Sequence, residues 1–327
     1  MKKYNILVTG VGAIIGYGII KCLRRSKYKD HILLIGIDIY GDAVGRNWCD
    51  HFQQGVLAMD DAFPEFLKEV IKNYNIDLVI PGIEQDIESI TNHFYIFSDL
   101  GVSFVLNMPE LIRLCNDKWE TFLFFKNEQV DMIKTYIDGD FNRLKCELGL
   151  PFLLKPRRSY ASKGIQEIES ATDYYYWKDK LGNNFMVQQI VGSYESEYTV
   201  GAIGLCDGTH SDIIVLKRKL AVDGASAKAT VVQEPELEKY VEKLCRITKP
   251  IGPTNYQVRY HEGSYLLLEI NPRISASTSI REAFGYNEAE MCIEYFLEGK
   301  IPDKRKMHSG SAVRYIEDFI KYDSNYC

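Results

Sequence analysis

The sequence lacks several features that mark particular classes of protein. No apolar run reaches the ~18 residues of a membrane-spanning helix, and no basic block or basic stripe with interleaved aromatics is present. The eight cysteines form no CxxC or CxxH pair of the kind that zinc and redox sites use. We therefore expect free thiols in a reducing cytoplasm, with no membrane and no nucleic acid as partner.

Composition and charge are those of an ordinary globular protein. The chain has 327 residues, of which 46% are hydrophobic and 26% are charged, and this length suits about two domains. The formal net charge of −6 argues against a general nucleic-acid binder. A phosphate ligand stays open, because a few local lysines matter more for it than the total charge.

The first ~110 residues alternate between strand and helix patterns. Apolar strands are expected at 5–10, 31–38, 76–82 and 102–106, and helices at 13–25, 62–74 and 86–101. Alternation of this kind predicts a doubly wound parallel sheet with helices on both faces.

The rest of the chain has a different pattern. A helix at 117–129 opens it, and strands follow at 151–156, 164–168, 185–191, 197–206, 211–220, 227–232, 255–260 and 264–270. Helices are expected at 171–181, 234–248 and 287–298. The turns at 206–210 and 261–264 carry the glycine and polar residues of hairpins. This region is therefore expected to be α+β.

A glycine-rich turn follows the first strand, with Gly10, Gly12, Gly16 and Gly18. A dinucleotide fingerprint G-x-G-x-x-G would need a third glycine where Ile15 stands, although Asp38 ends the next strand where a ribose-binding acid can lie. Any doubly wound domain favours glycine at this turn. A vestigial turn or a substrate contact is therefore favoured over a dinucleotide site, and both stay open.

Two stretches suit parts of a nucleotide. In "PFLLKPRRSYASKGIQEI" Lys155 ends an apolar strand before a cationic loop closed by Gly164, which suits a polyphosphate as well as it suits a solvated basic hairpin. In "FMVQQIVGSYESEYTV" an edge strand precedes Glu197, so backbone groups could bind adenine and the carboxylate a ribose. Taken alone, this second stretch favours a simple β-hairpin.

The stretch "LLLEINPRIS" carries polar residues at the end of an apolar strand. Glu269, Asn271 and Arg273 share one face of an ideal strand, as Gln257 and Arg259 do in the preceding one. If the two strands pair through 261–264, these groups converge, and their oxygens suit Mg²⁺. The alternative is an amphipathic hairpin whose polar face is exposed to solvent. The apolar residues that flank the polar ones on both strands disfavour this alternative.

Taken in order, these stretches resemble the ATP-grasp superfamily, in particular the carbamoyl phosphate synthase large chain and the pyrrolysine-biosynthesis ligase. The motifs that carry the resemblance are "NDK", "LLKP", "QQIV", "EYTV", "NYQVR" and "LLLEINPR". The resemblance implies a Rossmann-like pre-ATP-grasp domain at 1–112. It also implies an ATP-grasp fold whose small subdomain spans 113–187 and whose large subdomain spans 188–327, with ATP clasped between them.

The resemblance also implies roles for individual residues. The expected ATP contacts are Lys118, Lys155, Lys163, Gly164, Gln188, Gln189, Ile190, Val191 and Glu197. The expected metal ligands are Gln257, Glu269 and Asn271. The expected catalytic cations are Arg273, Arg218 and Lys219, with Lys228 beside them. The loop 157–164 would lie over the phosphates, although "RRSYASKG" has fewer glycines than such loops usually hold.

The activity that the resemblance implies is an ADP-forming ligase. ATP would phosphorylate a small-molecule carboxylate, and an amine or a thiol would attack the resulting acyl phosphate, with Mg²⁺ or Mn²⁺ as cofactor. Dimers are common among the similar enzymes, so a homodimer is left open. Two alternatives are a nicotinamide-dependent oxidoreductase that uses the N-terminal glycines and a catalytically silent ATP-binding sensor.

Overall fold

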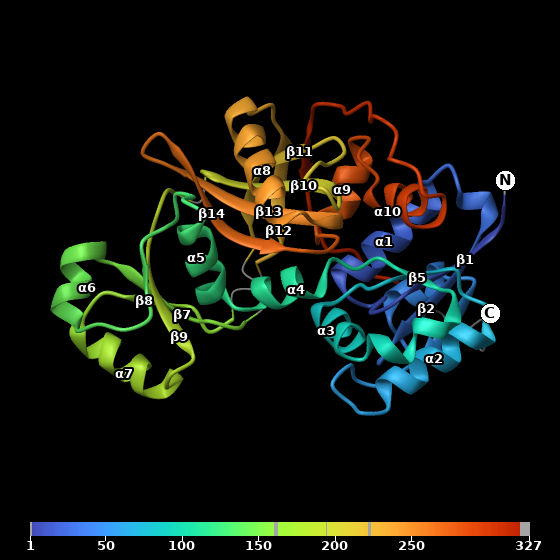
Figure 1. Cartoon of the computed structure of the whole chain (residues 1–327), viewed down its shortest axis with the longest axis horizontal. Helices are drawn as coiled ribbons and strands as arrows, with labels where there is room; N and C mark the ends of the chain where they lie inside the picture. Colours follow the sequence, from blue (N-terminus) through green and yellow to red (C-terminus); the bar gives the residue numbers. More distant parts are fainter. Residues whose placement is uncertain (1, 160–162, 194, 222–223, 321–327) are drawn as a thin grey trace.

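The computed structural model of this chain describes residues 2–159, 163–193, 195–221 and 224–320. These residues form three β-sheets, with a parallel sheet at one end of the molecule, a four-stranded sheet at the other and a six-stranded sheet between them (Figure 1). Within this part of the chain, no helix has both the length and the apolar character needed to cross a bilayer. All seven cysteines of the described residues are free thiols.

The first sheet is parallel and has the strand order β3-β2-β1-β4-β5. Its strands are β1 (Tyr4–Val8), β2 (Ile32–Asp38), β3 (His51–Gln54), β4 (Leu78–Ile80) and β5 (Ser103–Phe104). The helices of this region are α1 (Ile14–Arg25), α2 (Phe63–Asn73), α3 (Glu84–Asn92) and α4 (Pro109–Asn116), with 3-10 turns η1 (Lys29–His31), η2 (Val44–Trp48), η3 (Phe94–Ile96) and η4 (Ser98–Leu100). The order reverses between β1 and β4, which is where such sheets form a ligand crevice.

Side chains alternate across β1, so the two faces of this sheet have separate cores. Leu7 faces α2 and α3, where it joins Leu67, Val70 and Ile90. On the opposite face, Ile6 joins a core that contains α1 and also residues near the C-terminus. This confirms the parallel sheet with helices on both faces that the alternating pattern predicts.

The second face of the parallel sheet is completed by the end of the chain. Helices α9 (Thr278–Ala283) and α10 (Glu288–Cys292) lie beside α1 (Figure 1), and the π-helical segment η5 (Ile293–Leu297) packs against β4 and β5. Ala289, Cys292 and Ile293 share the buried core of α1 and β1. Segments more than 250 residues apart in sequence therefore stabilise one another, for example through Asn287, whose side chain donates to the carbonyl of Cys22.

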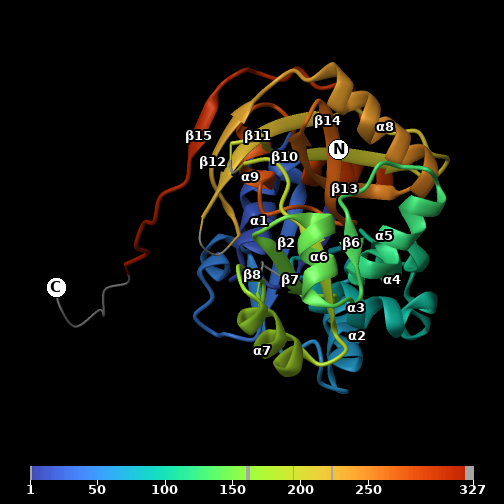
Figure 2. The ribbon, with the colours of Figure 1, turned by 90° about the vertical axis from the view of Figure 1, so that its left-hand side faces the viewer.

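The six-stranded sheet is antiparallel and has the order β14-β13-β10-β11-β12-β15. Its strands are β10 (Glu197–Leu205), β11 (Ile214–Leu220), β12 (Ser226–Val231), β13 (Ile251–His261), β14 (Ser264–Asn271) and β15 (Ser311–Val313). Helices α8 (Pro235–Thr248) and α5 (Lys118–Asn127) pack on one face of it. Figure 2 shows β15 next to β12 at the edge of this sheet.

The four-stranded sheet is antiparallel and has the order β6-β9-β7-β8. Its strands are β6 (Thr135–Tyr136), β7 (Phe152–Pro156), β8 (Gln166–Ile168) and β9 (Phe185–Gln189), and α6 (Phe141–Leu148) and α7 (Ala171–Leu181) cover it. Together with the six-stranded sheet it forms the expected pair of α+β units, which confirms the predicted fold class. The expected boundary between 187 and 188 falls inside β9.

Three details of the expected elements are wrong. The helix expected at 86–101 ends at Asn92 and continues as η3 and η4, because Phe94 and Phe97 turn in to pack on Phe104. The helix expected at 287–298 divides into α10 and the π-helical η5. Finally, several elements were not expected at all, namely α4, α6, α9, β3, β6 and β15. For α4 the available signal was Pro109, which occupies the first turn of a helix, as proline often does.

A buried ion pair joins the C-terminal helices to the six-stranded sheet. Arg281 of α9 donates to Glu288 of α10 over 2.7 Å and to Asn255 of β13 over 2.6 Å, and both members of the pair are fully buried. A methyl group on Gly201 of β10 would lie 2.5 Å from Arg281 Nη1, so this glycine makes room for the guanidinium.

We expect Glu288→Ala to lower the free energy of unfolding by about 3–5 kcal/mol, because it leaves the Arg281 charge buried without its partner. Chemical denaturation measures this change. Glu236→Ala is the matched control, since Glu236 pairs with Lys239 where both side chains are exposed, and its loss changes stability by less than about 1 kcal/mol. A Glu288→Ala variant as stable as the control would contradict this account of the buried pair.

Candidate functional site

The three sheets meet around a narrow cleft of about 30 Å³. Its polar walls come from the start of α3, from the start of α5 and from the end of β14. The residues that bring side-chain charge to this cleft are Glu84, Lys118, Glu269 and Arg273. Asn271 lines it as well. Four of these lining residues were expected from the sequence to act in one site, namely Lys118, Glu269, Asn271 and Arg273.

The pairing of β13 with β14 sets which side chains face this cleft. Gln257 lies opposite Glu269, and Asn255 lies opposite Asn271. The register shifts next to Gln257, where Val258 pairs with Leu267, so Leu268 is an extra residue on β14. Because of this bulge, Leu267 joins the core with Val258 while Glu269 and Asn271 share a face with Gln257.

The oxygen atoms on this face differ in how they are engaged. Gln257 Oε1 accepts from Arg218 over 2.9 Å, and Asn271 Oδ1 accepts from Arg273 over 3.2 Å. The Glu269 carboxylate has no hydrogen-bond donor among the residues that the structure describes. No cluster of three or more His, Cys, Asp or Glu suited to a metal occurs in the described residues. A cation here would therefore depend on one carboxylate and on amide oxygens, which is a donor set that fits Mg²⁺.

Lys155 is the next-to-last residue of β7 and is a buried cation. Its Nζ donates to Gln188 Oε1 over 2.7 Å, and Gln188 in turn donates to Thr135 Oγ1 over 2.9 Å. Burial, together with the nearby positive charge of Lys118, lowers the pKa of Lys155 to about 8, and the charge of Glu269 opposes this change. The side chain of Gln188 thus positions the lysine, and the four-stranded sheet delivers Lys155 to the same region as Lys118 and Glu269.

Lys118 opens α5 next to the loop after β7. Its Nζ donates to the carbonyl of Ser159 over 2.9 Å. The N-cap of the same helix is Asp117, which accepts from Arg157 over 2.8 Å and from the amide of Trp119. Burial by itself would raise the pKa of Asp117, but the hydrogen bond from Arg157 keeps this pKa below its usual range. Asp117 and Arg157 were not among the expected site residues, although an aspartate just before a helix is a strong N-cap signal.

The loop 157–164 lies partly outside the described residues, which exclude 160–162. Of its expected contacts, Lys163 is exposed. Gly164 has a φ of +79°, and a Cβ there would lie 2.9 Å from Pro156 Cγ, so the turn requires glycine.

In the segment expected to bind adenine, the amide of Gln189 donates to the carbonyl of Lys134, and Val191 is buried. Ile190 lies between them, just past the end of β9.

Glu197 lies between two arginines at the start of β10. Arg218 donates to its Oε1 over 2.8 Å, and Arg259 donates to its Oε2 over 2.9 Å. The Glu197 side chain is only 3% exposed. The expectation from the sequence was a ribose contact, and the geometry adds a second role, in which Glu197 fixes Arg218 next to Gln257.

The structure does not bring Lys219 into this arginine cluster. Lys219 follows Arg218 on β11, and successive side chains of a strand point to opposite faces. Lys219 lies opposite Lys228 of β12, and both are exposed. The three basic residues expected to act together are therefore divided between a buried arginine and two exposed lysines.

Arg273 lies just beyond β14, not in the strand as simple alternation implies. It contacts the Glu84 carboxylate and donates to the carbonyl of Ile274 over 2.9 Å. Its Nε is buried without a hydrogen-bond partner. Sequence reasoning missed Glu84, which begins α3 directly after β4. The available signal was its position after a strand of a parallel sheet, where ligand-binding residues are common.

The chain matches one protein-family model and several curated proteins. The model for "ATP-grasp in the biosynthetic pathway with Ter operon" matches residues 181–319. The carbamoyl phosphate synthase large chain of Methanosarcina acetivorans is 24% identical over 241 residues, which cover 67% of this chain and 22% of that protein. A formate-dependent phosphoribosylglycinamide formyltransferase of Prochlorococcus marinus is 30% identical over 190 residues, which cover 56% of this chain and 45% of that protein. The chain thus spans less than half the length of these two relatives.

Solved structures share the fold of nearly the whole chain. N5-carboxyaminoimidazole synthetase from Staphylococcus aureus, complexed with ADP, has a TM-score of 0.75 at 15% identity and covers 94% of this chain and 81% of its own. Biotin carboxylase from Campylobacter jejuni has a TM-score of 0.72 at 14% identity, over 94% of this chain and 74% of its own. At such low identity these likenesses show the fold alone. Residues 181–319 thus match an ATP-grasp family model, and the three sheets together have the ATP-grasp fold.

Proposed function

We propose that this protein is an ADP-forming ligase that joins a small-molecule carboxylate to an amine or a thiol through an acyl phosphate. The observation that carries the proposal is the convergence of Lys118, Glu269, Asn271 and Arg273 around one cleft, with Lys155 beside them. The reaction must bring two anions, a triphosphate and a carboxylate, into one place. Preorganised cations in a water-poor cleft are the usual means of doing so.

Lys118 and Lys155 are proposed to bind the ATP phosphates. They come from two different segments, α5 and β7, and each is already held by a hydrogen bond that fixes its ammonium group. Lys163 and Gly164 are proposed to add contacts from the loop above the phosphates. Because phosphoryl transfer demands mainly positioning and charge stabilisation, fixed cations of this kind are what it needs.

The adenine is proposed to bind along the segment that follows β9, from Gln188 to Val191. Backbone groups would read the base edge, which leaves the Gln188 side chain free to hold Lys155 as observed. Glu197 is proposed to contact the ribose. Each of its oxygens already accepts two N–H groups, Oε1 from Arg218 and Oε2 from Arg259. A ribose hydroxyl would therefore replace one of these hydrogen bonds when it binds.

Mg²⁺, or Mn²⁺ in its place, is proposed to be held by Glu269, Asn271 and Gln257. When bound, the metal neutralises phosphate charge and orients the transferred group. The unengaged carboxylate of Glu269 is the primary ligand in this proposal. Arg218, which now contacts Gln257, and Arg273, which now contacts Asn271, would then act on the phosphate and the acyl group. Lys219 is proposed only as a more distant contribution to the positive potential.

The domain roles, the partners and the compartment are proposed as well. The units 1–112, 113–187 and 188–327 are proposed to act as substrate, small ATP-binding and large ATP-binding domains. The partners are small-molecule carboxylates and amines, the compartment is the cytoplasm, and a homodimer is the oligomer to test first. The similar proteins support a ligase, since their names include a synthetase complexed with ADP and a carbamoyl phosphate synthase.

The direct test is a screen for phosphate release from Mg·ATP against pairs of carboxylates and amines or thiols. We expect phosphate and ADP to appear only when a matched pair is present, because the acyl phosphate is consumed by the second substrate. ATP binding without ADP release across a broad panel would favour a nucleotide sensor. NAD(P)H oxidation, or protection of the fold by NAD but not by Mg·ATP, would favour the oxidoreductase.

Glu269→Gln should remove the effect of Mg²⁺ on nucleotide affinity. In the wild type we expect Mg²⁺ to tighten ADP binding by about tenfold or more, and in the variant by less than about twofold, because the carboxylate proposed as the primary metal ligand is lost. Calorimetric titration with ADP, with and without Mg²⁺, measures both values. Glu236→Gln, which changes an exposed carboxylate on α8, is the control. An unchanged Mg²⁺ effect in Glu269→Gln would remove the metal assignment.

ADP binding should weaken as the pH rises through about 8, since Lys155 then loses the charge that attracts phosphate. Between about pH 7.5 and about pH 9.5 we expect a loss of roughly tenfold in affinity. Lys155→Arg keeps its charge over this range and should flatten the profile. Lys155→Met, which has no titrating group, should bind weakly at both pH values. A wild-type profile that Lys155→Arg reproduces in full would show that Lys155 does not contact the phosphates.

A further inference from the structure

A second and much larger cavity, of about 720 Å³, lies at the carboxyl end of the parallel sheet. Residues that follow β1, β2 and β4 line it, where the strand order reverses. Open α/β sheets bind ligands at this point, and the volume falls in the range of ~300–1,000 Å³ that is typical of small-molecule sites. None of the roles proposed for the nucleotide and the metal uses this space.

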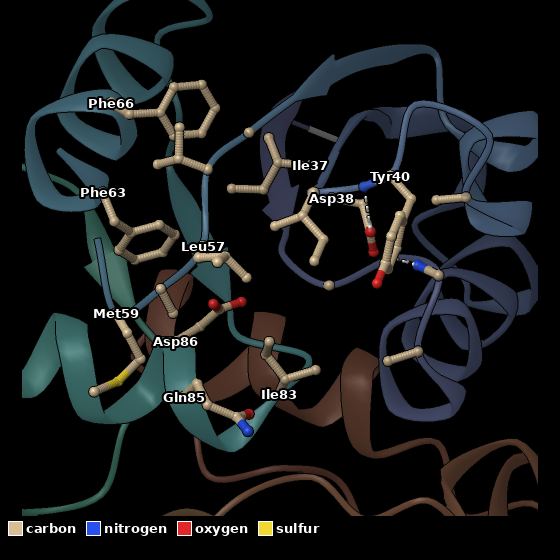
Figure 3. Close-up of a pocket in the computed structure, with 18 of the residues that line it drawn as sticks. Ile37, Asp38, Tyr40, Leu57, Met59, Phe63, Phe66, Ile83, Gln85 and Asp86 are labelled. Carbon is tan, nitrogen blue, oxygen red and sulfur yellow. Dashed lines mark hydrogen bonds between the residues drawn. The ribbon is translucent and has the colours of Figure 1, made fainter. Parts of the chain in front are cut away.

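Apolar side chains form most of the cavity walls. Figure 3 shows Phe63 and Phe66 of α2 on one side and Ile37 and Tyr40 on the other, with Leu57 between them. Leu57 is 61% exposed, although it lines a hollow next to two aromatic rings. Walls of this kind suit a ligand with an apolar body.

The charged side chains that line the cavity are all acidic. They are Asp38, Asp42 and Asp86, and no Lys, Arg or His belongs to the lining among the described residues. Arg46, on the turn that follows, donates instead to the carbonyl of Gly41 and does not line the cavity. The cavity therefore carries negative charge against an apolar wall.

Asp86 is the most informative of these residues. It is only 4% exposed, and one of its oxygens accepts from the Thr9 hydroxyl, which itself accepts from the amide of Gly82. Its other oxygen has no hydrogen-bond donor among the described residues, and Figure 3 shows the carboxylate directed into the cavity. Burial, with a smaller contribution from the charge of Asp38, raises the pKa of Asp86 to about 7, although the hydrogen bond from Thr9 opposes this rise. A buried carboxylate without a cationic partner is unfavourable, so its position favours a cation.

The same geometry disfavours an anionic ligand such as a dinucleotide. Asp38 accepts from the amide of Gly12 over 2.7 Å and from the amide of Tyr40 over 3.0 Å. The amide of Gly12 lies just before α1, in the turn where a dinucleotide fold places its pyrophosphate. A protein carboxylate already occupies that donor, and the neighbouring charge of Asp86 would repel a phosphate.

We propose that this cavity binds a small organic cation, namely a primary ammonium group on an aliphatic or aromatic body. The ammonium lies against Asp86, and the body fills the space between Phe63, Phe66 and Tyr40. The site stands apart from the proposed ligase reaction but adjoins it in the chain. Ile83 and Gln85 line the cavity, while Glu84 between them lines the narrow cleft and contacts Arg273.

Calorimetric titration of the full chain with 4-phenylbutylamine tests the proposal without ATP, so its outcome is independent of the ligase activity. We expect saturable binding of the amine and at least about tenfold weaker binding of the neutral 4-phenylbutanol and the anionic 4-phenylbutyrate. Asp86→Asn should weaken amine binding by about tenfold or more, because it removes the charge while its amide oxygen can still accept from Thr9. Phe66→Ala should weaken the binding of amine and alcohol alike.

Asp61→Asn is the matched control, since Asp61 is an exposed aspartate outside the cavity, and it should leave amine affinity within about twofold of wild type. Absence of saturable amine binding would overturn the proposal, as would equal binding of the amine and the alcohol. Unchanged affinity in Asp86→Asn would overturn it too. If Asp86→Asn fails to fold, the comparison of amine with alcohol on the wild type decides the matter alone.

Discussion

The register between β13 and β14 is the constraint on which the candidate site depends. A single extra residue, Leu268, lets Leu267 pack with Val258 in the core and still leaves Glu269 opposite Gln257. Without that bulge, strict alternation would turn either the apolar or the polar residues to the wrong side. This one bulge therefore keeps the apolar side chains in the core on one face of the strand. It also places a row of carboxylate and amide oxygens on the other face. The buried arginine that contacts Gln257 is held in turn by Glu197, so the polar face is built as a connected network.

The same site depends on contacts between parts of the chain that are distant in sequence. Glu84 follows a strand of the parallel sheet and meets Arg273, which follows the last long strand of the six-stranded sheet. The C-terminal helices pack on α1 and complete the core of the parallel sheet. The parallel sheet is therefore joined to the six-stranded sheet by a hydrophobic interface and an ion pair at the cleft. A ligand in the large cavity would contact Ile83 and Gln85, and Glu84 between them lines the narrow cleft. The two proposed sites are therefore adjacent along this short segment.

Much of the fold follows from the sequence, and the reasons for success and failure are physical. Apolar periodicity shows the parallel sheet and the β13–β14 hairpin, because both depend on local alternation and on turn residues. Periodicity does not show the contact of Glu84 with Arg273, since the two lie 189 residues apart. The placement of Arg218 and Lys219 on opposite faces does follow from strand alternation, and the expectation that they act together overlooked it. The cavity around Asp86 is equally invisible in a sequence, because it is the space left between Leu57, Phe66 and Tyr40 after the helices have packed.

The central claim is that Glu269, Asn271 and Gln257 hold a divalent ion that carries a nucleotide phosphate. A crystal structure of the full chain with ADP and Mn²⁺, with the anomalous signal of manganese measured, tests this most directly. The account places the manganese peak within bonding distance of the Glu269 carboxylate, with the phosphates near Lys118 and Lys155. A nucleotide bound elsewhere, with Gln257 still on Arg218 and no metal at Glu269, would contradict it.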